Sequence, residues 1–335
     1  MTSRVQNKTA ASAPVELASP SARQAFRRRL LFWYERKRRD LPWRDSRDPY
    51  RIWISEVMLQ QTRVSAVLPY YQRFLQQFPA VQALAAAPEQ AVLAAWSGLG
   101  YYRRARALHA AAHIVVAEHG GELPSKAAAL RQLPGFGRYT AAAVASIAYG
   151  EPVPVVDGNV ERVLSRLFAW TEPGRDAAWS MAERLLARQR PGDFNQAMME
   201  LGATVCLPGE AQCARCPVFR WCNTRGRGRP KKQEPRRDGQ LHYRLAQRDR
   251  AVWLVQRSRR ASLMPSMWEL PEVAKNGAPA DLTLRHSITV TDFLVEVSRG
   301  EPPSGLRGRW LTRAQVEALP LTGLTRKILR RANFI

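Results

Sequence analysis

The feature that most constrains the fold is a tight turn inside a long helical stretch. Alanine, leucine and arginine recur at helical spacing over residues 23–222, which predicts a mainly α fold. The segment 134–137, Pro-Gly-Phe-Gly, ends one predicted helix near Leu133, and a second, alanine-rich helix begins near Arg138. Two glycines permit positive φ and leave backbone N–H groups uncovered at a helix N-terminus, where an anion can bind. This predicts a helix–hairpin–helix that holds a phosphate, with an ordinary interhelical turn as the alternative.

The charge of the chain favours a polyanionic partner. Its 335 residues include 52 Lys and Arg against 28 Asp and Glu, a net charge of +24. Nucleic acid is the commonest such partner, although ribosome-like and membrane-surface proteins can be equally basic. No apolar run approaches the ~20 residues of a membrane helix, and the polar N-terminus lacks an apolar signal core. We therefore expect a cytoplasmic protein that does not enter a membrane.

Composition divides the chain into four segments. Residues 1–22 are small and polar and predict a disordered tail, and residues 23–222 form the helical domain. Residues 223–239 contain seven basic residues, three Gly and two Pro, and predict a linker that could also contact phosphates. Over residues 240–335 apolar and polar residues alternate, as in AVWLVQR, and short helical segments follow. This pattern predicts a small α+β domain.

All four cysteines lie within 17 residues, at Cys206, Cys213, Cys216 and Cys222. A secreted disulfide framework would spread them out, so the cluster indicates a metal site in a reducing compartment. Four thiolates this close could hold one [4Fe–4S] cluster or one tetrahedral zinc. Structural zinc usually pairs two Cys-x2-Cys knuckles and only one is present, so the spacing favours the iron–sulfur cluster, in a structural role. Reduced thiols without a ligand are the remaining alternative.

The order of the short motifs resembles that of the endonuclease III superfamily. The motifs are LPWR, SEVMLQQT, GLGYYRRAR, LPGFGRYTA, VDGNVERVL and FNQAMMELG, followed by the cysteine loop at 206–222. Over residues 23–222 they are most similar to those of MutY-type adenine DNA glycosylases, and the resemblance weakens beyond them. It implies two helical lobes that bind double-stranded DNA between them, a [4Fe–4S] cluster, and removal of adenine mispaired with 8-oxoguanine or guanine. We expect a monomer associated with the nucleoid.

Two carboxyls form the predicted catalytic pair. Cleavage of an N-glycosidic bond needs a proton donor at the departing base and an anion near the sugar. Glu56 lies in the apolar stretch WISEVMLQQT, which predicts a raised pKa, and the resemblance implies that it protonates adenine; an exposed Glu on an amphipathic helix is the alternative. Asp157 precedes a helix, where Asp is usually an N-cap. The resemblance adds stabilisation of the sugar cation, with Asn159 orienting Asp157 or the water.

Tyr139 distinguishes the subfamilies. In lyase-competent relatives the matching residue is a Lys that attacks the sugar as an amine, and a phenol cannot form the Schiff base. We therefore expect a monofunctional glycosylase, although Tyr139 could simply pack beside the hairpin.

Arg44 and Glu200 match residues of the family's adenine pocket and could equally be ordinary ion-pair partners.

Extrusion of a nucleotide costs a few kcal/mol of stacking and pairing, so inserted side chains must replace the stack. Gln61 and Tyr101 match the helix-penetrating residues of the family, although Tyr101 could pack in a core. A basic helix with Arg103, Arg104 and Arg106 follows Tyr101 and is expected to bind phosphates. The predicted DNA-binding residues are Gln61, Tyr101, Leu133, Gly135, Gly137 and Arg138.

The C-terminal domain departs from the family pattern. In MutY-type enzymes it resembles a Nudix fold and helps to recognise 8-oxoguanine, and LMPSMWELPE resembles one of its segments. A full Nudix hydrolase box is absent, so no pyrophosphate hydrolysis is expected. The family's recognition loop often ends in Phe-Ser-His, whereas this chain has Ile288, Thr289 and Val290. Thr289 is the candidate for a hydrogen bond to a base edge, and the selectivity for 8-oxoguanine stays open.

Two other functions stay open. A glycosylase for thymine opposite guanine, or for an oxidised pyrimidine, is disfavoured by Tyr139 and by the appended domain that contains β-strands. A non-catalytic iron–sulfur protein that binds DNA is disfavoured by the pair of Glu56 and Asp157.

Overall fold

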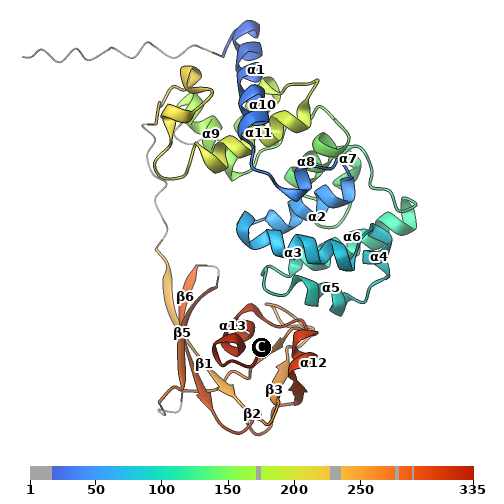
Figure 1. Cartoon of the computed structure of the whole chain (residues 1–335), viewed down its shortest axis with the longest axis vertical. Helices are drawn as coiled ribbons and strands as arrows, with labels where there is room; N and C mark the ends of the chain where they lie inside the picture. Colours follow the sequence, from blue (N-terminus) through green and yellow to red (C-terminus); the bar gives the residue numbers. More distant parts are fainter. Residues whose placement is uncertain (1–16, 171–174, 227–234, 276–278, 289) are drawn as a thin grey trace, which may run out of the picture. The chain divides into compact units, whose positions relative to one another are not determined.

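The computed structural model describes residues 17–170, 175–226, 235–275, 279–288 and 290–335 (Figure 1). Of these, one compact unit comprises the described residues within 1–52, 124–132 and 136–231, and a second comprises those within 53–123, 133–135 and 232–335. Helices fill the described chain up to residue 222, and strands begin at Arg237. The helical periodicity and the later alternation therefore predicted the two kinds of structure correctly.

The helical part contains eleven α-helices among the described residues, with short 3-10 helices at its turns. They are α1 (Pro20–Lys37), η1 (Pro42–Arg44), α2 (Pro49–Leu59), α3 (Val64–Gln77), α4 (Val81–Ala86), α5 (Glu89–Trp96), α6 (Arg103–Glu118), α7 (Ala127–Leu130), α8 (Arg138–Ala148), α9 (Gly158–Phe168), α10 (Arg175–Leu185), α11 (Pro191–Thr204), η2 (Cys213–Arg215) and η3 (Phe219–Trp221).

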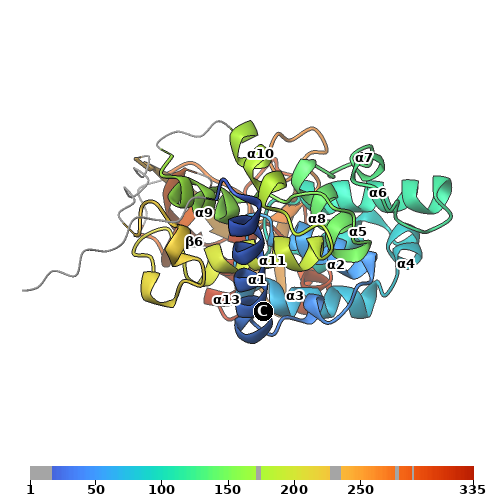
Figure 2. The ribbon, with the colours of Figure 1, turned by 90° about the horizontal axis from the view of Figure 1, so that it is seen from above.

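The core of the first unit joins α1 and α9 to α11, which packs against both (Figure 2). Phe26 on α1 is fully buried. Its ring meets Phe194 at 6.5 Å and Trp221 edge-on at 5.6 Å between centroids. Trp221 belongs to the cysteine loop, so this loop is anchored in the same core as the helices. Aromatic contacts of this kind stabilise a core beyond the area that they bury.

Two predicted boundaries were wrong by a few residues. The tail was expected to reach residue 22, but Leu17 is buried and α1 begins at Pro20, where the Ser19 hydroxyl accepts from the N–H of Ala22. The linker was expected to reach residue 239, but β1 begins at Arg237. The rest of the predicted tail, and residues 227–234 of the predicted linker, lie outside the described residues.

The C-terminal domain combines two sheets and two helices. Its elements are β1 (Arg237–Leu245), β2 (Gln247–Arg248), β3 (Ala251–Gln256), β4 (Trp268–Glu269), β5 (Leu282–Ile288), β6 (Thr291–Arg299), β7 (Gly308–Thr312), α12 (Arg313–Glu317) and α13 (Gly323–Arg331). In one sheet β6 pairs with β1 in parallel and with β5 antiparallel, and in the other β3 pairs with β2, β4 and β7, all antiparallel.

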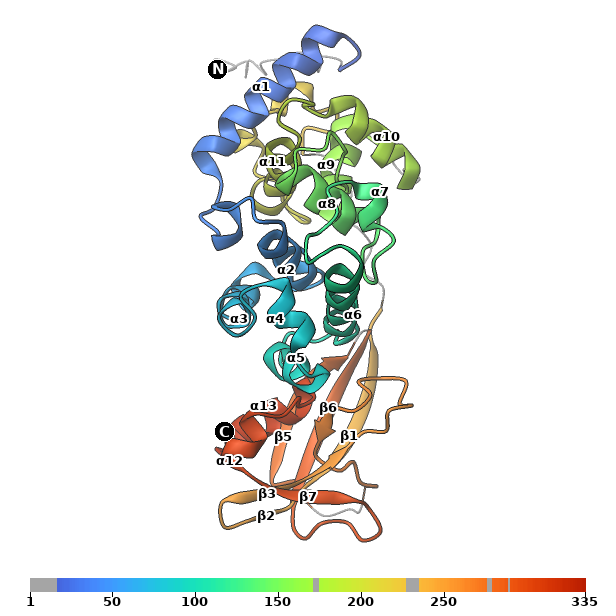
Figure 3. The same cartoon turned by 90° about the vertical axis from the view of Figure 1, so that its right-hand side faces the viewer.

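One apolar core joins both sheets to α13 (Figures 1 and 3). Val295 of β6, Leu254 of β3 and Ile328 of α13 are fully buried in it. The strands and helices after residue 235 therefore share an apolar interior. Among the described helices of the whole chain, none combines the length and the apolar character needed to cross a lipid bilayer.

Candidate active site

Glu56 lies in the middle of α2 and is buried. Its side chain is 5% exposed, and Ile54 and Met58 on either side are fully buried. The helix starts beside Asp48, whose carboxylate accepts from the N–H of Tyr50 at 2.9 Å and so satisfies one of the first amides. The interpretation of Glu56 as an exposed residue of an amphipathic helix is therefore wrong. A carboxyl this far removed from solvent is a candidate functional group.

Asp157 caps α9, as its position before the helix predicted. One carboxylate oxygen accepts from the N–H of Val160 at 2.7 Å, and the other accepts from the Asn159 amide at 2.8 Å. Burial raises the pKa of Asp157, and these hydrogen bonds act against that rise. This contact is compatible with Asn159 orienting Asp157, one of its two predicted roles, and the role itself stays a prediction.

Arg162 connects this carboxyl to the cysteine loop. Its guanidinium donates to the Asn159 side-chain oxygen at 2.8 Å, to the carbonyl of Gly202 at 2.7 Å and to that of Cys206 at 2.8 Å. A Cβ on Gly202 would lie 2.6 Å from the Cβ of Asn159, so glycine permits the close approach of α11 to α9. Asp157, Asn159 and the first cysteine thus belong to one hydrogen-bonded network, which the sequence analysis missed.

The four cysteines are half-buried thiols of the first unit. Arg166 donates to the Cys206 sulfur at 3.3 Å. Burial, with the charges of the three other thiols, raises the pKa of Cys216 to about 12. Within the described residues, no three His, Cys, Asp or Glu side chains are placed to hold a single metal ion. The four sulfurs would nevertheless repel one another as thiolates. A positively charged metal cluster bound by all four would stabilise that ionised form.

The hairpin has the predicted turn, with one difference. Gly135 has φ +79°, and a Cβ there would lie 2.8 Å from the Cβ of Ala107. Both the backbone conformation and the lack of space therefore require glycine. Gly137 has φ −71° and is the N-cap of α8, where no side-chain oxygen caps the helix. Of the two glycines that permit positive φ, Gly135 adopts it and Gly137 does not. Leu133 is buried, and its role as a DNA-binding residue stays a prediction.

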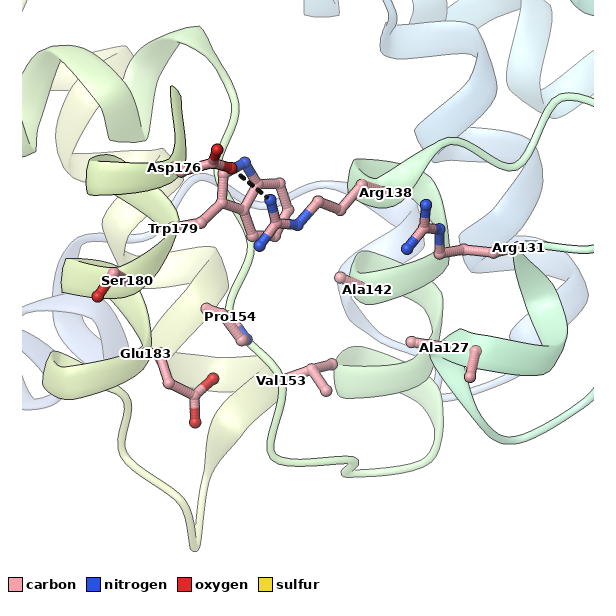
Figure 4. A pocket seen from close by; sticks show the side chains of 11 residues that line it. Ala127, Arg131, Arg138, Ala142, Val153, Pro154, Asp176, Trp179, Ser180 and Glu183 are labelled. Carbon is pink, nitrogen blue, oxygen red and sulfur yellow. Dashed lines mark hydrogen bonds and ion pairs between the residues drawn. The ribbon is translucent and has the colours of Figure 1, made fainter. Parts of the chain in front are cut away.

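Arg138, the first residue of α8, is held by α10. Its guanidinium lies over the Trp179 ring at 4.0 Å and within 3.4 Å of the Asp176 carboxylate (Figure 4). An open pocket of about 450 Å³ adjoins it, with Arg131 and Arg138 on one side and Asp176 and Glu183 on the other. The aromatic contact restricts the side chain that was predicted to bind DNA.

Glu200 and Arg44 form an ion pair. Glu200 is fully buried on α11 and accepts from Arg44 at 2.7 Å and from Arg39 at 2.7 and 2.8 Å. Burial raises the pKa of Glu200, but the hydrogen bonds from the two arginines and the charge of Arg44 outweigh burial and bring it down to about 2. The ion-pair alternative is confirmed, and the base-pocket role stays a prediction. Arg39 was missed, because a basic residue after a helix gives no sign of its partner.

Gln61 and Tyr101 share an unusual backbone. Both have positive φ, +56° and +49°, which costs a side chain of this type about 1 kcal/mol. Tyr101 is 50% exposed, so its alternative role in a core is wrong. The neighbouring Arg104 was expected to bind phosphates but is turned inward, toward backbone carbonyls.

Tyr139 lies one residue into α8. Its hydroxyl donates to the Met199 sulfur at 3.4 Å, and its ring packs on the cluster of Ala142, Ala143 and Val155. The predicted packing beside the hairpin is present, and the catalytic consequence of Tyr139 stays a prediction. Thr289 lies outside the described residues.

Comparisons with known proteins identify relatives of this chain. Residues 54–188 match the family described as "HhH-GPD superfamily base excision DNA repair protein". The fold is similar to that of a thermostable thymine-DNA glycosylase, with a TM-score of 0.57 and 31% identity over 62% of this chain and 97% of that chain. It is also similar to endonuclease III in a non-covalent DNA complex, with a TM-score of 0.52 and 23% identity over 61% and 97%, a likeness of fold alone.

The helices, the hairpin and the match over residues 54–188 assign this part of the chain to the class that the HhH-GPD model describes. The chain is 42% identical to the adenine DNA glycosylase of Mycobacterium tuberculosis over 64% of its own length and 72% of that protein. It is 49% identical to the human adenine DNA glycosylase over 61% of this chain and 40% of the human protein. The chain belongs to the adenine DNA glycosylase family. It spans about half the length, or less, of the human and Arabidopsis thaliana relatives.

Proposed function

We propose that this chain removes adenine mispaired with 8-oxoguanine or guanine from double-stranded DNA. The observation that carries the proposal is the burial of Glu56, an acid in the middle of α2. It is supported by Asp157, which caps α9, and by the 42% identity to a bacterial adenine DNA glycosylase.

In the proposed reaction the adenine nucleotide leaves the duplex before its glycosidic bond breaks. Glu56 transfers its proton to the adenine ring, and the bond from the sugar C1′ to adenine breaks with its electron pair going to the base. The ionised Asp157 stabilises the positive charge that develops on the sugar. A water oxygen then bonds to C1′, and one proton of this water restores the acid form of Glu56.

Tyr139 leaves water as the nucleophile that attacks the sugar. A phenol at this position supplies no amine, so no Schiff base forms and the sugar–phosphate backbone stays intact. A product that breaks only after treatment with alkali supports the proposal. A strand break at the rate of base release, through an adduct that borohydride traps, contradicts it.

Cys206, Cys213, Cys216 and Cys222 are proposed to hold a [4Fe–4S] cluster. Such a cluster would give the loop a rigid, positively charged centre that compensates four thiolates in a structural role. Metal analysis of the purified protein decides between the candidate ligands. Four iron ions and four sulfides per chain support the cluster, and one zinc per chain identifies the alternative site.

The C-terminal domain is proposed to be a Nudix-like module that contacts the base opposite adenine. Its sheet with parallel and antiparallel pairs, packed with a helix, is compatible with this assignment. Thr289 would donate a hydrogen bond to that base. A Thr289→Val variant should then lose preference for 8-oxoguanine over guanine while it still releases adenine.

The test is base release from three duplexes under single-turnover conditions. They carry adenine opposite 8-oxoguanine, adenine opposite guanine, and thymine opposite guanine, and alkali treatment reveals the released base. We expect breaks only at adenine. A Glu56→Gln variant should bind the same duplexes and release adenine about 10³-fold more slowly, because it has lost the proton donor. Normal release by this variant would refute the role of Glu56.

A second candidate is a glycosylase for thymine opposite guanine. The likeness to a thymine-DNA glycosylase at 31% identity favours it. Breaks only at thymine in the same assay would establish it. Binding of all three duplexes without any release would instead indicate a protein that recognises DNA without catalysis.

A further inference from the structure

Arg104 lies between the end of α2 and the turn before α6, and its guanidinium contacts both. One terminal nitrogen, Nη1, donates to the carbonyls of Val57, Met58 and Gln60 at 2.9, 2.9 and 2.5 Å. The last carbonyls of an α-helix have no partner inside the helix. Arg104 therefore caps the C-terminus of α2 from outside, with a positive charge at the negative end of the helix dipole.

The other terminal nitrogen, Nη2, holds the turn in front of α6. It donates to the carbonyls of Leu99 and Gly100 at 3.2 and 3.1 Å and to the Thr62 hydroxyl at 3.1 Å. The guanidinium also lies 5.5 Å from the centre of the Tyr101 ring. Six acceptors thus surround two nitrogens with four hydrogens, so some N–H groups are shared.

These contacts bracket the two residues with left-handed backbones. Gln61, at φ +56°, lies between the bonded Gln60 and Thr62, and Tyr101, at φ +49°, directly follows the bonded Gly100. Two segments about 40 residues apart in sequence are therefore fixed in one geometry by a single planar group. Only a fork with separate nitrogens can reach both segments, which a single ammonium cannot do.

We propose that Arg104 is a positioning residue that sets Gln61 and Tyr101 for entry into the duplex. It acts through their backbones and does not itself bind phosphate. This inference rests on the proposed function, because it assumes that these two side chains replace the extruded adenine in the base stack. Without the guanidinium, each of the two turns could relax to an ordinary conformation independently of the other.

The test compares two duplexes that differ in the cost of extrusion. One carries adenine opposite guanine, and the other carries adenine opposite an abasic site, where pairing is already lost. In an Arg104→Lys variant the ratio of single-turnover release rates, the first duplex over the second, should fall at least about tenfold, because misplaced inserting groups matter most for the paired base. A ratio within twofold of wild type would overturn the inference.

Arg103→Ala is the matched control, since Arg103 is the exposed neighbour of Arg104 on α6. It removes a charge and should weaken binding of both duplexes alike, which leaves the ratio unchanged. A fall of the ratio in Arg103→Ala as large as in Arg104→Lys would show that the effect is not specific to the contacts of Arg104 and would overturn the inference. If Arg104→Lys does not fold, Thr62→Val decides: it removes one acceptor, and its ratio must fall at least about twofold for the inference to stand.

A separate signal distinguishes failure of the inference from failure of the proposed function. Fluorescence of 2-aminopurine in place of adenine reports unstacking of the base without chemistry. A wild-type chain that gives this signal but releases no adenine contradicts the proposed function alone. In that case loss of the signal in Arg104→Lys supports the role of Arg104, and an unchanged signal overturns it.

Discussion

Two carboxyls of the first unit, the half-buried Asp157 and the fully buried Glu200, have pKa values shifted in opposite directions. Burial raises the pKa of Asp157 despite its hydrogen bonds to Val160 and Asn159. Glu200 is buried as well, but two arginines hold its pKa at about 2, so it is ionised throughout the physiological range. The difference lies in the partners: neutral N–H donors surround Asp157, whereas guanidinium ions surround Glu200.

Replacement of Asp157 separates its two roles. Asn keeps the oxygen that caps the helix but loses the one that accepts from Asn159, so Asp157→Asn should lower the free energy of unfolding by about 0.5–1 kcal/mol, and Asp157→Ala, which also loses the cap, by about 1 kcal/mol more. Adenine release by Asp157→Asn should fall at least about 100-fold, because the anion near the sugar is gone. Urea unfolding and single-turnover rates measure the two effects. An unimpaired rate in Asp157→Asn would leave it with capping alone.

Glu200 should make the stability of the protein depend on pH. Its pKa falls from an ordinary 4.5 to about 2 on folding. The resulting stabilisation is complete above pH ~5 and is lost as the pH falls toward 2, and in full it is on the order of 3 kcal/mol. Wild type should therefore lose about 2 kcal/mol more than Glu200→Gln between pH 7 and pH 3, as measured by urea unfolding. Equal losses in both proteins would show that the ion pair adds no net stability.

At the scale of elements, helix ends and turns bear most of the candidate site. Asp157 begins α9, Arg138 begins α8, and Gln61 and Tyr101 follow the ends of α2 and α5. Backbone groups at such ends lack partners inside the helix, so they are available to ligands and to buried arginines.

The hairpin offers a paired test of this element. Gly135→Ala would strain a backbone at φ +79° and press its Cβ against Ala107, so we expect a loss of about 1–3 kcal/mol and weaker DNA binding. Gly137→Ala meets open space at φ −71° and should change stability by less than about 0.5 kcal/mol. Thermal unfolding and filter binding measure both. Equal effects of the two changes would contradict the assignment of the turn.

Local signals in the sequence were sufficient for several of these features. An acid among apolar residues predicted the burial of Glu56, an Asp before a helix predicted the cap at Asp157, and clustered glycines predicted the hairpin. Ser19 followed by Pro20 is a helix-start signal that would also have corrected the beginning of α1. The inward position of Arg104 could not be predicted, because its acceptors lie up to 47 residues away and a basic helix does not show which of its charges are buried.

At the scale of the whole molecule, the charge of +24 should dominate encounters with DNA. Each phosphate contact releases a counterion, so affinity for undamaged duplex should fall by on the order of 10³-fold between 50 and 200 mM salt if about six phosphates are contacted. Fluorescence anisotropy over that range measures the slope of the logarithm of the affinity against the logarithm of the salt concentration. Arg104→Lys should leave the slope unchanged, because residue 104 faces backbone carbonyls. A nearly flat slope for wild type would contradict binding through phosphates.

The left-handed backbones at Gln61 and Tyr101 also bear on how such a protein can be improved in the laboratory. Glycine would relieve the strain at either position, so selection for heat tolerance alone should favour Gln61→Gly and Tyr101→Gly. The same substitutions would delete the side chains that are proposed to enter the base stack. A thermostable variant obtained in this way would survive heating yet be a poorer repair protein, and directed evolution should therefore screen for both properties together.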